Sequence, residues 1–171
     1  ERDKEEKEND IKNNIIKTGK SFLGVFTDTK RCVQDLNVIL NHIKKKHQDY
    51  KDEKDYIKIY KKYLKAQKKN TMYMLDYEDI IRLQKEKYRE PKVIPWPCPA
   101  IFIDDMTHTA LMSNSINNEF SHLCLHYRHF DGLGITLFMA FQTFKSGLTK
   151  VVRANLSLIF IFGTCNIQEI E

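Results

Sequence analysis

Two adjacent carboxylates, Asp104 and Asp105, come directly after a short apolar run at residues 101–103. Two of the three residues in this run are β-branched, and the run predicts a short buried strand. Ligands of parallel α/β sheets bind at the carboxyl ends of the strands. One carboxylate there can hold Mg²⁺, usually through water, and a second can orient or deprotonate an attacking water. The pair is therefore a candidate site for metal-assisted hydrolysis.

Gln142 stands at the end of a second apolar run, residues 135–141, and a third run covers residues 158–162. Between the runs, the apolar spacing predicts a helix from residue 117 or 118 to about residue 130, and a short one at 149–155. This succession of strands and helices is typical of an α/β fold with a parallel sheet. Asp104, Asp105 and Gln142 would then share one edge of the sheet, where we expect a nucleotide to bind.

The length and composition of the chain indicate which class of protein these elements belong to. It has 171 residues, of which 42% are hydrophobic, enough for one domain with a real core. The four cysteines are far apart and form no CxxC pair, which indicates neither a zinc ribbon nor a disulfide framework. No apolar run is long enough to predict a membrane span, and the charged N-terminus is unlike a signal peptide. We expect a soluble intracellular protein, whose numbering begins inside a longer product because residue 1 is Glu.

The positive charge is concentrated in the first half of the chain. Residues 1–92 carry 24 Lys and Arg against 17 Asp and Glu, whereas residues 93–171 carry 4 against 6. Such an excess can face a polyanion. A solvated helix surface explains it equally well, so both interpretations stay open.

A charged stretch opens the chain, and we expect residues 1–21 to be a disordered lead-in. It ends in Gly19-Lys20-Ser21, which has the last three residues of a phosphate-binding P-loop. A P-loop also needs Gly five places before Gly19, a preceding strand and a following helix. Asn14 occupies that place, charged residues precede the motif, and a predicted strand at 22–26 follows it. We therefore expect no phosphate cradle in this segment.

Three amphipathic helices are predicted after this strand. The first starts near the N-cap candidates at 27–29 and ends at the lysines 44–46, as the helix dipole favours; its apolar stripe is Val33, Leu36, Leu40 and Ile43. The second covers about residues 52–69 and has lysines around an apolar face formed by Tyr56, Ile59, Tyr60, Tyr63 and Leu64. The third runs from Asp76 to about Tyr88, with Ile80, Ile81 and Leu83 directed inward.

The lysines and tyrosines of the second helix alternate along the sequence, and this pattern allows two interpretations of what the helix contacts. Lysines can contact phosphates while tyrosines stack on bases. We favour the other interpretation, in which the aromatic stripe packs against the sheet domain.

Three histidines of the predicted helix near residue 120, namely His122, His126 and His129, lie about one turn apart. Two histidines at this spacing can hold a metal ion. No HExxH glutamate accompanies them, so we favour surface or interface histidines.

Several segments, taken together in order and spacing, resemble the genome-packaging ATPase of large nucleocytoplasmic DNA viruses, a member of the FtsK/HerA branch of the P-loop motors. They are PAIFIDDMT at 99–107, YRH at 127–129, GIT at 134–136 with Gln142 closing its strand, and KVVRAN at 150–155. The resemblance covers mainly residues 93–171. It implies an α/β fold of the P-loop NTPase (RecA/FtsK-like) type with a parallel sheet, interrupted by a helical insertion.

The resemblance also implies roles for single residues. Asp104 would be the Walker B ligand of Mg²⁺, and Asp105 the catalytic carboxylate. Gln142 would be the polar sensor that contacts the γ-phosphate of ATP or the attacking water. Arg153, with Arg128 as a second candidate, would be the arginine that a neighbouring subunit offers in trans, where a guanidinium stabilises the charge on the transferred phosphoryl group. An ion pair at a helix surface is an equally good interpretation of both arginines, and a strand-end hydrogen bond is an equally good one of Gln142.

The implied protein is an Mg-ATP-driven motor that moves double-stranded DNA into capsids. Its expected partners are DNA, further copies of itself in a ring, expected to be a hexamer, and capsid proteins. Its expected location is the host cytoplasm, the viral factory or the virion.

One departure from the family pattern is that no Walker A loop matches. Either that loop lies before residue 1, which makes this chain alone inactive, or the chain is a non-catalytic interaction or DNA-binding module derived from such an ATPase. The resulting domain prediction is a lead-in at 1–21, ATPase core at 22–43, a charged helical insertion at 44–92, and ATPase core again at 93–171.

Overall fold

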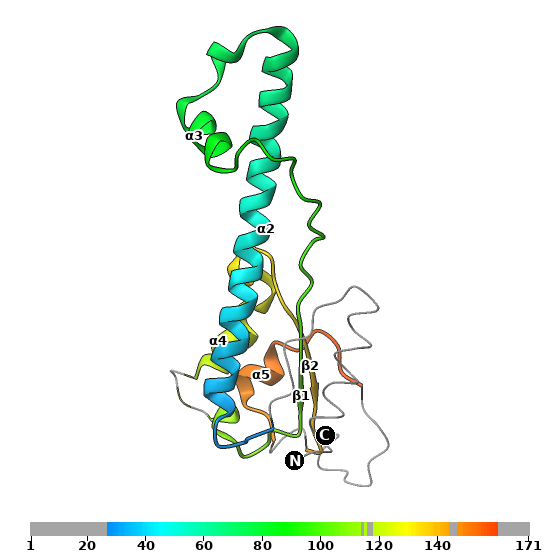
Figure 1. Cartoon of the computed structure of the whole chain (residues 1–171). Helices are drawn as coiled ribbons and strands as arrows, with labels where there is room; N and C mark the ends of the chain where they lie inside the picture. The colour runs from blue at the N-terminus through cyan, green and yellow to red at the C-terminus, as the bar shows by residue number, and fades with distance from the viewer. Residues whose placement is uncertain (1–26, 114, 116–117, 144–146, 161–171) are drawn as a thin grey trace. The chain divides into compact units, whose positions relative to one another are not determined.

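The computed structural model describes residues 27–113, 115, 118–143 and 147–160 (Figure 1). Along the chain, it combines helices with a small sheet of two parallel strands, so the fold is α/β in the general sense. The chain divides into two compact units. One comprises the described residues of the ranges 1–40, 102–127 and 137–171, and the other comprises residues 41–101 and 128–136. The predicted lead-in and the predicted strand at 22–26 lie outside the described residues.

Helix α2 (Cys32–Lys69) is one continuous helix, so the prediction of two helices separated near residues 44–46 is wrong (Figure 1). The segment between the two predicted helices, HQDYK at 47–51, contains no Gly or Pro that would interrupt the backbone hydrogen bonds of a helix. The predicted apolar stripe is largely confirmed, because Leu36, Leu40 and Ile43 are buried.

In the unit formed by residues 41–101 and 128–136, a hairpin folds back beside the C-terminal half of α2. It contains the 3-10 turn η1 (Met72–Met74) and helix α3 (Tyr77–Lys85), which begins after Asp76 as predicted. Leu83 is buried with 1% of its surface exposed, whereas Ile81 is 46% exposed, so the inward placement of Ile81 is wrong.

The aromatic stripe of α2 packs against this hairpin. The rings of Tyr56, Tyr60, Tyr63 and Tyr88 follow one another with centroid separations of 6.0, 5.8 and 5.4 Å. The hydroxyl of Tyr56 donates to the backbone oxygen of Arg89 at 2.8 Å. The partner predicted for the stripe was the sheet domain. The partner found is the segment of residues 88–89, about 25 residues after Tyr63 in the chain. This segment has no apolar periodicity that would mark it as a partner.

The sheet consists of β1 (Ala100–Asp104) and β2 (Thr136–Ala140). The backbone N–H of Thr136 donates to the oxygen of Pro99, and that of Asp105 donates to the oxygen of Ala140, both at 2.9 Å, which sets the parallel register. Ile101 and Ile103 are buried, as predicted for the first strand.

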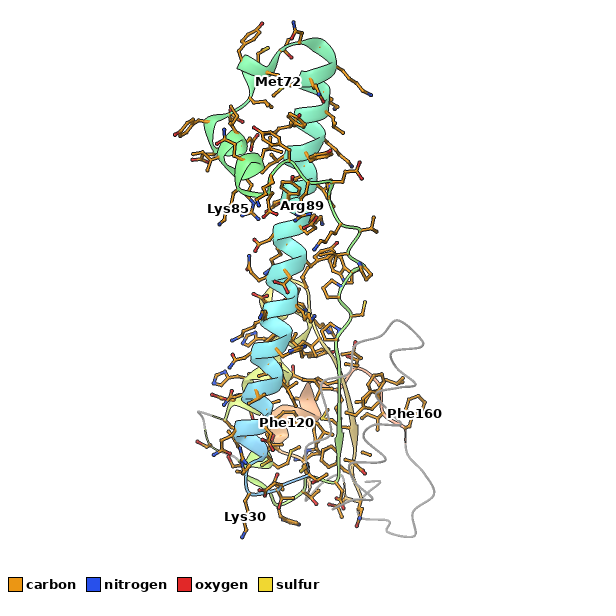
Figure 2. All side chains as sticks on the ribbon, in the orientation of Figure 1. Lys30, Met72, Lys85, Arg89, Phe120 and Phe160 are labelled. Atoms are coloured by element: carbon orange, nitrogen blue, oxygen red, sulfur yellow. The ribbon has the colours of Figure 1, made fainter. Side chains whose placement is uncertain are left out.

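The second strand is not the continuously buried strand that its composition predicted. Phe138 is 49% exposed and stacks on Phe102 of β1, which is 76% exposed, with ring centroids 4.7 Å apart. Residues of β1 therefore alternate between buried and exposed, whereas those of β2 alternate between partly exposed and exposed. The predicted core strand at 158–162 is also wrong where it is described, because residues 158–160 form no strand and are exposed, and the label of Phe160 marks this segment in Figure 2. The remaining two residues lie outside the described part.

The core of the other unit forms around α4 (Glu119–His126), which contacts both η2 (Ala110–Met112) and α5 (Lys150–Ala154). Its buried side chains include Leu111, Met112, Phe120, Leu123, Cys124 and Val152. Each large apolar side chain buried here contributes about 1.5–3 kcal/mol to folding.

Helix α4 begins at its predicted cap but ends earlier than predicted. Asn118 caps it, since its Oδ1 accepts from the N–H groups of Phe120 and Ser121. The chain continues as a 3-10 segment, η3 (Tyr127–Gly132), and leaves helical geometry at Phe130 and Asp131, where φ of Asp131 is +49°. Among the described helices, none has the length and apolar character needed to cross a membrane.

Candidate functional site

Asp105 and Gln142 meet at the carboxyl ends of the two paired strands. Asp105 follows the last residue of β1, and Gln142 comes two residues after the end of β2. The side-chain Nε2 of Gln142 donates to Oδ2 of Asp105 at 2.7 Å. The edge that the sequence predicted for these two residues is therefore the edge they occupy, because the parallel register carries both chain segments to the same end of the sheet.

The backbone of Asp105 holds its carboxylate in a specific position. Its φ is +44°, in the left-handed region that a non-glycine residue rarely adopts. The hydroxyl of Thr107 donates to Oδ1 of Asp105 at 3.1 Å, so each carboxylate oxygen has one side-chain donor. One residue at this site was missed from the sequence, namely Thr107. The only signal for it is its position two residues after an aspartate, a common spacing in turns.

Gly147 lies close to Thr143 and Thr107, the second of which contacts Asp105. A Cβ atom at residue 147 would lie 2.5 Å from the backbone oxygen of Thr143 and 2.6 Å from Cγ2 of Thr107. No side chain fits in that space. The close approach of residue 147 supports Thr107, which in turn contacts Asp105.

Asp104 is the last residue of β1 and its side chain is exposed. Within the described ranges its carboxylate has neither a hydrogen bond nor an ion pair. Mg²⁺ in nucleotide sites is held by one or two carboxylates, with water and substrate phosphates as its remaining ligands. The adjacent carboxylates of Asp104 and Asp105 fit that donor set, although no group of three or more His, Cys, Asp or Glu residues that could cage a metal occurs in the described part of the chain.

The two candidate arginines lie on separate segments. Arg153 is on α5 and is half-buried, and Arg128 is in η3 and is exposed. Among the described residues, the side chains that donate to the carboxylate of Asp105 are those of Thr107 and Gln142. A role in trans would require a neighbouring subunit, and it stays a prediction.

Comparison of the chain with protein-family models, with curated proteins and with solved structures finds no match.

His122, His126 and His129 are all exposed, and no grouping of them with other metal-ligating residues occurs among the described residues. Cys124, on the buried side of the same helix, has its thiol pKa raised to about 12 by burial. A thiol with this pKa is a packed apolar group and a poor nucleophile.

Several electrostatic contacts that the sequence did not predict lie in the unit of residues 41–101 and 128–136. Hydrogen bonds from Arg89 lower the pKa of Glu53, and the same bonds raise the pKa of Arg89 above its usual range. His47 is fully buried, and this burial lowers its pKa, although Asp131, 3.5 Å away, acts in the opposite direction. These contacts hold the hairpin and residues 128–136 to α2.

Proposed function

We propose that this chain provides the catalytic sheet edge of an ATP-driven motor that moves double-stranded DNA, of the type that packages genomes into viral capsids. The observation that supports this most is the 2.7 Å hydrogen bond from Gln142 to Asp105 at the carboxyl ends of two parallel strands. In a P-loop ATPase, the Walker B strand would contribute such a carboxylate and the sensor strand such an amide. The proposed P-loop fold would include more strands than these two.

In this proposal Asp104 holds a hydrated Mg²⁺, and Asp105 orients the water that attacks the γ-phosphate of ATP. Bound Mg²⁺ would supply charge neutralisation of the phosphates. Gln142 positions the carboxylate of Asp105 and senses the nucleotide. Arg153 or Arg128 would act on the site of an adjacent copy in a ring, where a guanidinium stabilises charge on the transferred phosphoryl group.

The experiment is an ATPase assay on the natural protein that carries this sequence, with and without duplex DNA. We expect DNA-stimulated hydrolysis, and we expect Asp105→Asn to lower kcat by about a hundredfold or more, the scale of a lost general base. Asp49→Asn, which removes an exposed carboxylate on α2, is the matched control and should leave kcat unchanged. Equal turnover in both variants would reject the role of Asp105.

A second candidate is a non-catalytic interaction module. It is favoured by the unit of residues 41–101 and 128–136, which is compact and has aromatic and ionic contacts of its own. Binding of Mg-ATP to the natural protein separates the two candidates. Tight binding that weakens in Asp104→Asn favours the motor, and no binding at millimolar ATP favours the module.

A further inference from the structure

A row of six lysines follows one side of the C-terminal half of α2. They are Lys51, Lys54, Lys58, Lys61, Lys65 and Lys68, spaced three and four residues apart without interruption. Residues at this spacing share one face of a helix. From first to last the row extends about 26 Å along the helix axis.

The apolar stripe of the same helix segment is on a different side. Tyr56, Tyr60 and Tyr63 pack on one another and reach Tyr88 of the hairpin. The tyrosines are therefore used internally and are not free to stack on a ligand, whereas the lysines remain at the surface.

The charges of the row are compensated at one end only. Lys51 pairs with Asp131 at 3.2 Å and Lys58 with Asp55 at 2.8 Å, while the amino group of Lys54 lies over the ring of Trp96. These contacts use the N-terminal half of the row.

The C-terminal half of the row lacks such partners. Lys61, Lys65 and Lys68 form no ion pair in the part of the chain that the structure describes. Three exposed, uncompensated lysines within two turns of a helix repel one another and favour a polyanion.

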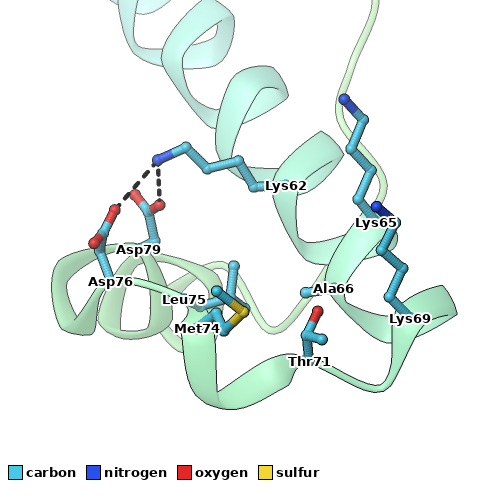
Figure 3. A pocket seen from close by; sticks show the side chains of 9 residues that line it. All are labelled: Lys62, Lys65, Ala66, Lys69, Thr71, Met74, Leu75, Asp76 and Asp79. Atoms are coloured by element: carbon cyan, nitrogen blue, oxygen red, sulfur yellow. Dashed lines mark hydrogen bonds and ion pairs between the residues drawn. The ribbon is translucent and has the colours of Figure 1, made fainter.

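A pocket at the end of α2 separates this row from the acidic side of the hairpin. The pocket has a volume of about 310 Å³, and Ala66, Met74 and Leu75 contribute its apolar lining. Lys62 crosses to the acidic side, where its amino group binds Asp79 at 2.8 Å and Asp76 at 3.4 Å (Figure 3).

On the other side of this pocket, Lys65 and Lys69 extend away from the two aspartates (Figure 3). The negative charge near the pocket is thus satisfied by Lys62. Lys61, Lys65 and Lys68 are therefore left without a counterion in the part of the chain that the structure describes.

We infer that Lys61, Lys65 and Lys68, with Lys69 beside them, form a docking surface for the phosphodiester backbone of duplex DNA. Duplex DNA presents one negative charge per about 1.7 Å along its axis, so it can engage all the lysines of a straight row at once. A lipid surface fits less well, because a helix that lies on a membrane inserts an apolar face, and that face of α2 is buried against the hairpin. The inference rests on the proposed function for its biological setting only.

The test is fluorescence anisotropy of a labelled 30-base-pair duplex of mixed sequence with the 171-residue chain, at several salt concentrations and without ATP or Mg²⁺. We expect the triple variant Lys61→Gln, Lys65→Gln, Lys68→Gln to lose about tenfold or more in affinity. The slope of log K against log salt should decrease by about 2.7, since each lost phosphate contact removes about 0.9. The corresponding triple change to Arg should retain the binding.

The matched control removes the same charge elsewhere, as Lys45→Gln, Lys46→Gln, Lys85→Gln, and should retain the wild-type slope. Equal losses in both triple variants, or no DNA binding by the wild type, would overturn the inference. Tighter binding to vesicles of phosphatidylserine and phosphatidylcholine than to DNA would overturn it as well and assign the row to a lipid surface. DNA binding without ATP hydrolysis by the natural protein would reject only the proposed motor, whereas ATP hydrolysis without binding at the row would reject only this surface.

Discussion

Arg89 and Glu53, 36 residues apart in the chain, form a bidentate ion pair in which Nη1 donates to Oε1 at 2.9 Å and Nη2 donates to Oε2 at 2.6 Å. The backbone N–H of Lys92 also donates to Oε1 of Glu53, at 2.6 Å. Arg89 lies over the ring of Tyr56, and Figure 2 shows it against α2. This pair therefore fixes the segment that leaves the hairpin to the middle of α2.

Replacing Arg89 by Ala should destabilise the protein by about 2–3 kcal/mol, because it leaves the carboxylate of Glu53, with 8% of its side chain exposed, without its charged partner. Urea unfolding followed by circular dichroism measures the change. Arg82→Ala is the control, because Arg82 has no side-chain partner among the described residues. An equal effect of the two substitutions would show that the ion pair contributes nothing specific.

The same pair predicts how stability depends on acid. The pKa of Glu53 in the folded protein lies below its ordinary value of 4.5, first because Arg89 hydrogen-bonds the charged form. The folded state therefore binds its proton at lower pH than the unfolded state does. The stabilisation is complete above pH 4.5 and is lost as the pH falls through the lowered pKa. Glu53→Gln should have a lower stability at pH 7 and a flatter decline below pH 4.5, and a decline as steep as that of the wild type would contradict this.

His47 should give a second, separate pH dependence. Burial lowers its pKa below 6.5, so the unfolded chain takes up a proton first as the pH falls. Stability should decrease from about pH 6.5 down to the lowered pKa and become level below it. The groups that face the ring are Asp131, which opposes the shift, and Lys51, which reinforces it.

The measurement for His47 is the free energy of unfolding of His47→Gln between pH 5 and 7. We expect this decline to be absent in the variant and retained in His126→Gln, which changes an exposed histidine. Retention of the full decline in His47→Gln would assign it to other groups.

Asn118 should be the most sensitive polar residue of its unit. Its Oδ1 caps α4, while its Nδ2 donates to the backbone oxygens of Leu111 and Ser113 at 2.7 and 2.8 Å. Asn118→Ala should cost about 2–3 kcal/mol, because it removes the cap and leaves a buried carbonyl unsatisfied. Asn118→Ser keeps a capping oxygen and should cost less, and thermal unfolding would separate the two. Equal midpoints for both variants would mean that the cap itself is unimportant.

Gly147→Ala should disturb the loop that supports Asp105. The new methyl group would meet Thr143 and Thr107 at distances below 3 Å, so we expect a destabilisation of about 1–3 kcal/mol. Gly132→Ala is the control, because the nearest atom to its new Cβ is Nζ of Lys51 at 3.9 Å and only the positive φ of +75° opposes the change. If ATP hydrolysis depends on Asp105, Gly147→Ala should lower it more than Gly132→Ala does at matched temperature.

The local elements were predictable from the sequence where a cap and a short apolar repeat occur together. Asn118 and Thr149 cap the helices expected after them, and the strand before Asp105 is present. Ends of elements were less predictable. Lysines within α2 resemble a C-terminal signal, but a helix continues through them when no Gly or Pro follows.

Long-range contacts account for most of what the sequence did not reveal. The strand at 136–140 has the composition of a buried strand, yet Phe138 is exposed. Whether a side chain of a sheet is buried depends on which other elements pack on that face of the sheet, and the strand's own sequence does not encode this. The partner of Glu53 likewise depends on where the hairpin returns, which no local spacing encodes. For the candidate site, the meeting of Asp105 with Gln142 followed from the expected parallel strands, while the contribution of Thr107 required the positive φ of Asp105.

Parallel pairing of β1 with β2 also has a kinetic consequence. Their hydrogen bonds form only after the chain between Asp104 and Thr136 has closed into a loop of about 30 residues, a step that carries an entropic cost. Helix α2, by contrast, needs contacts between residues four positions apart and can form within microseconds. Asp105 and Gln142 should accordingly come together late in folding. A partly folded chain, during synthesis or after mild heating, would therefore have the lysine row of α2 in place before the carboxylate–amide pair forms.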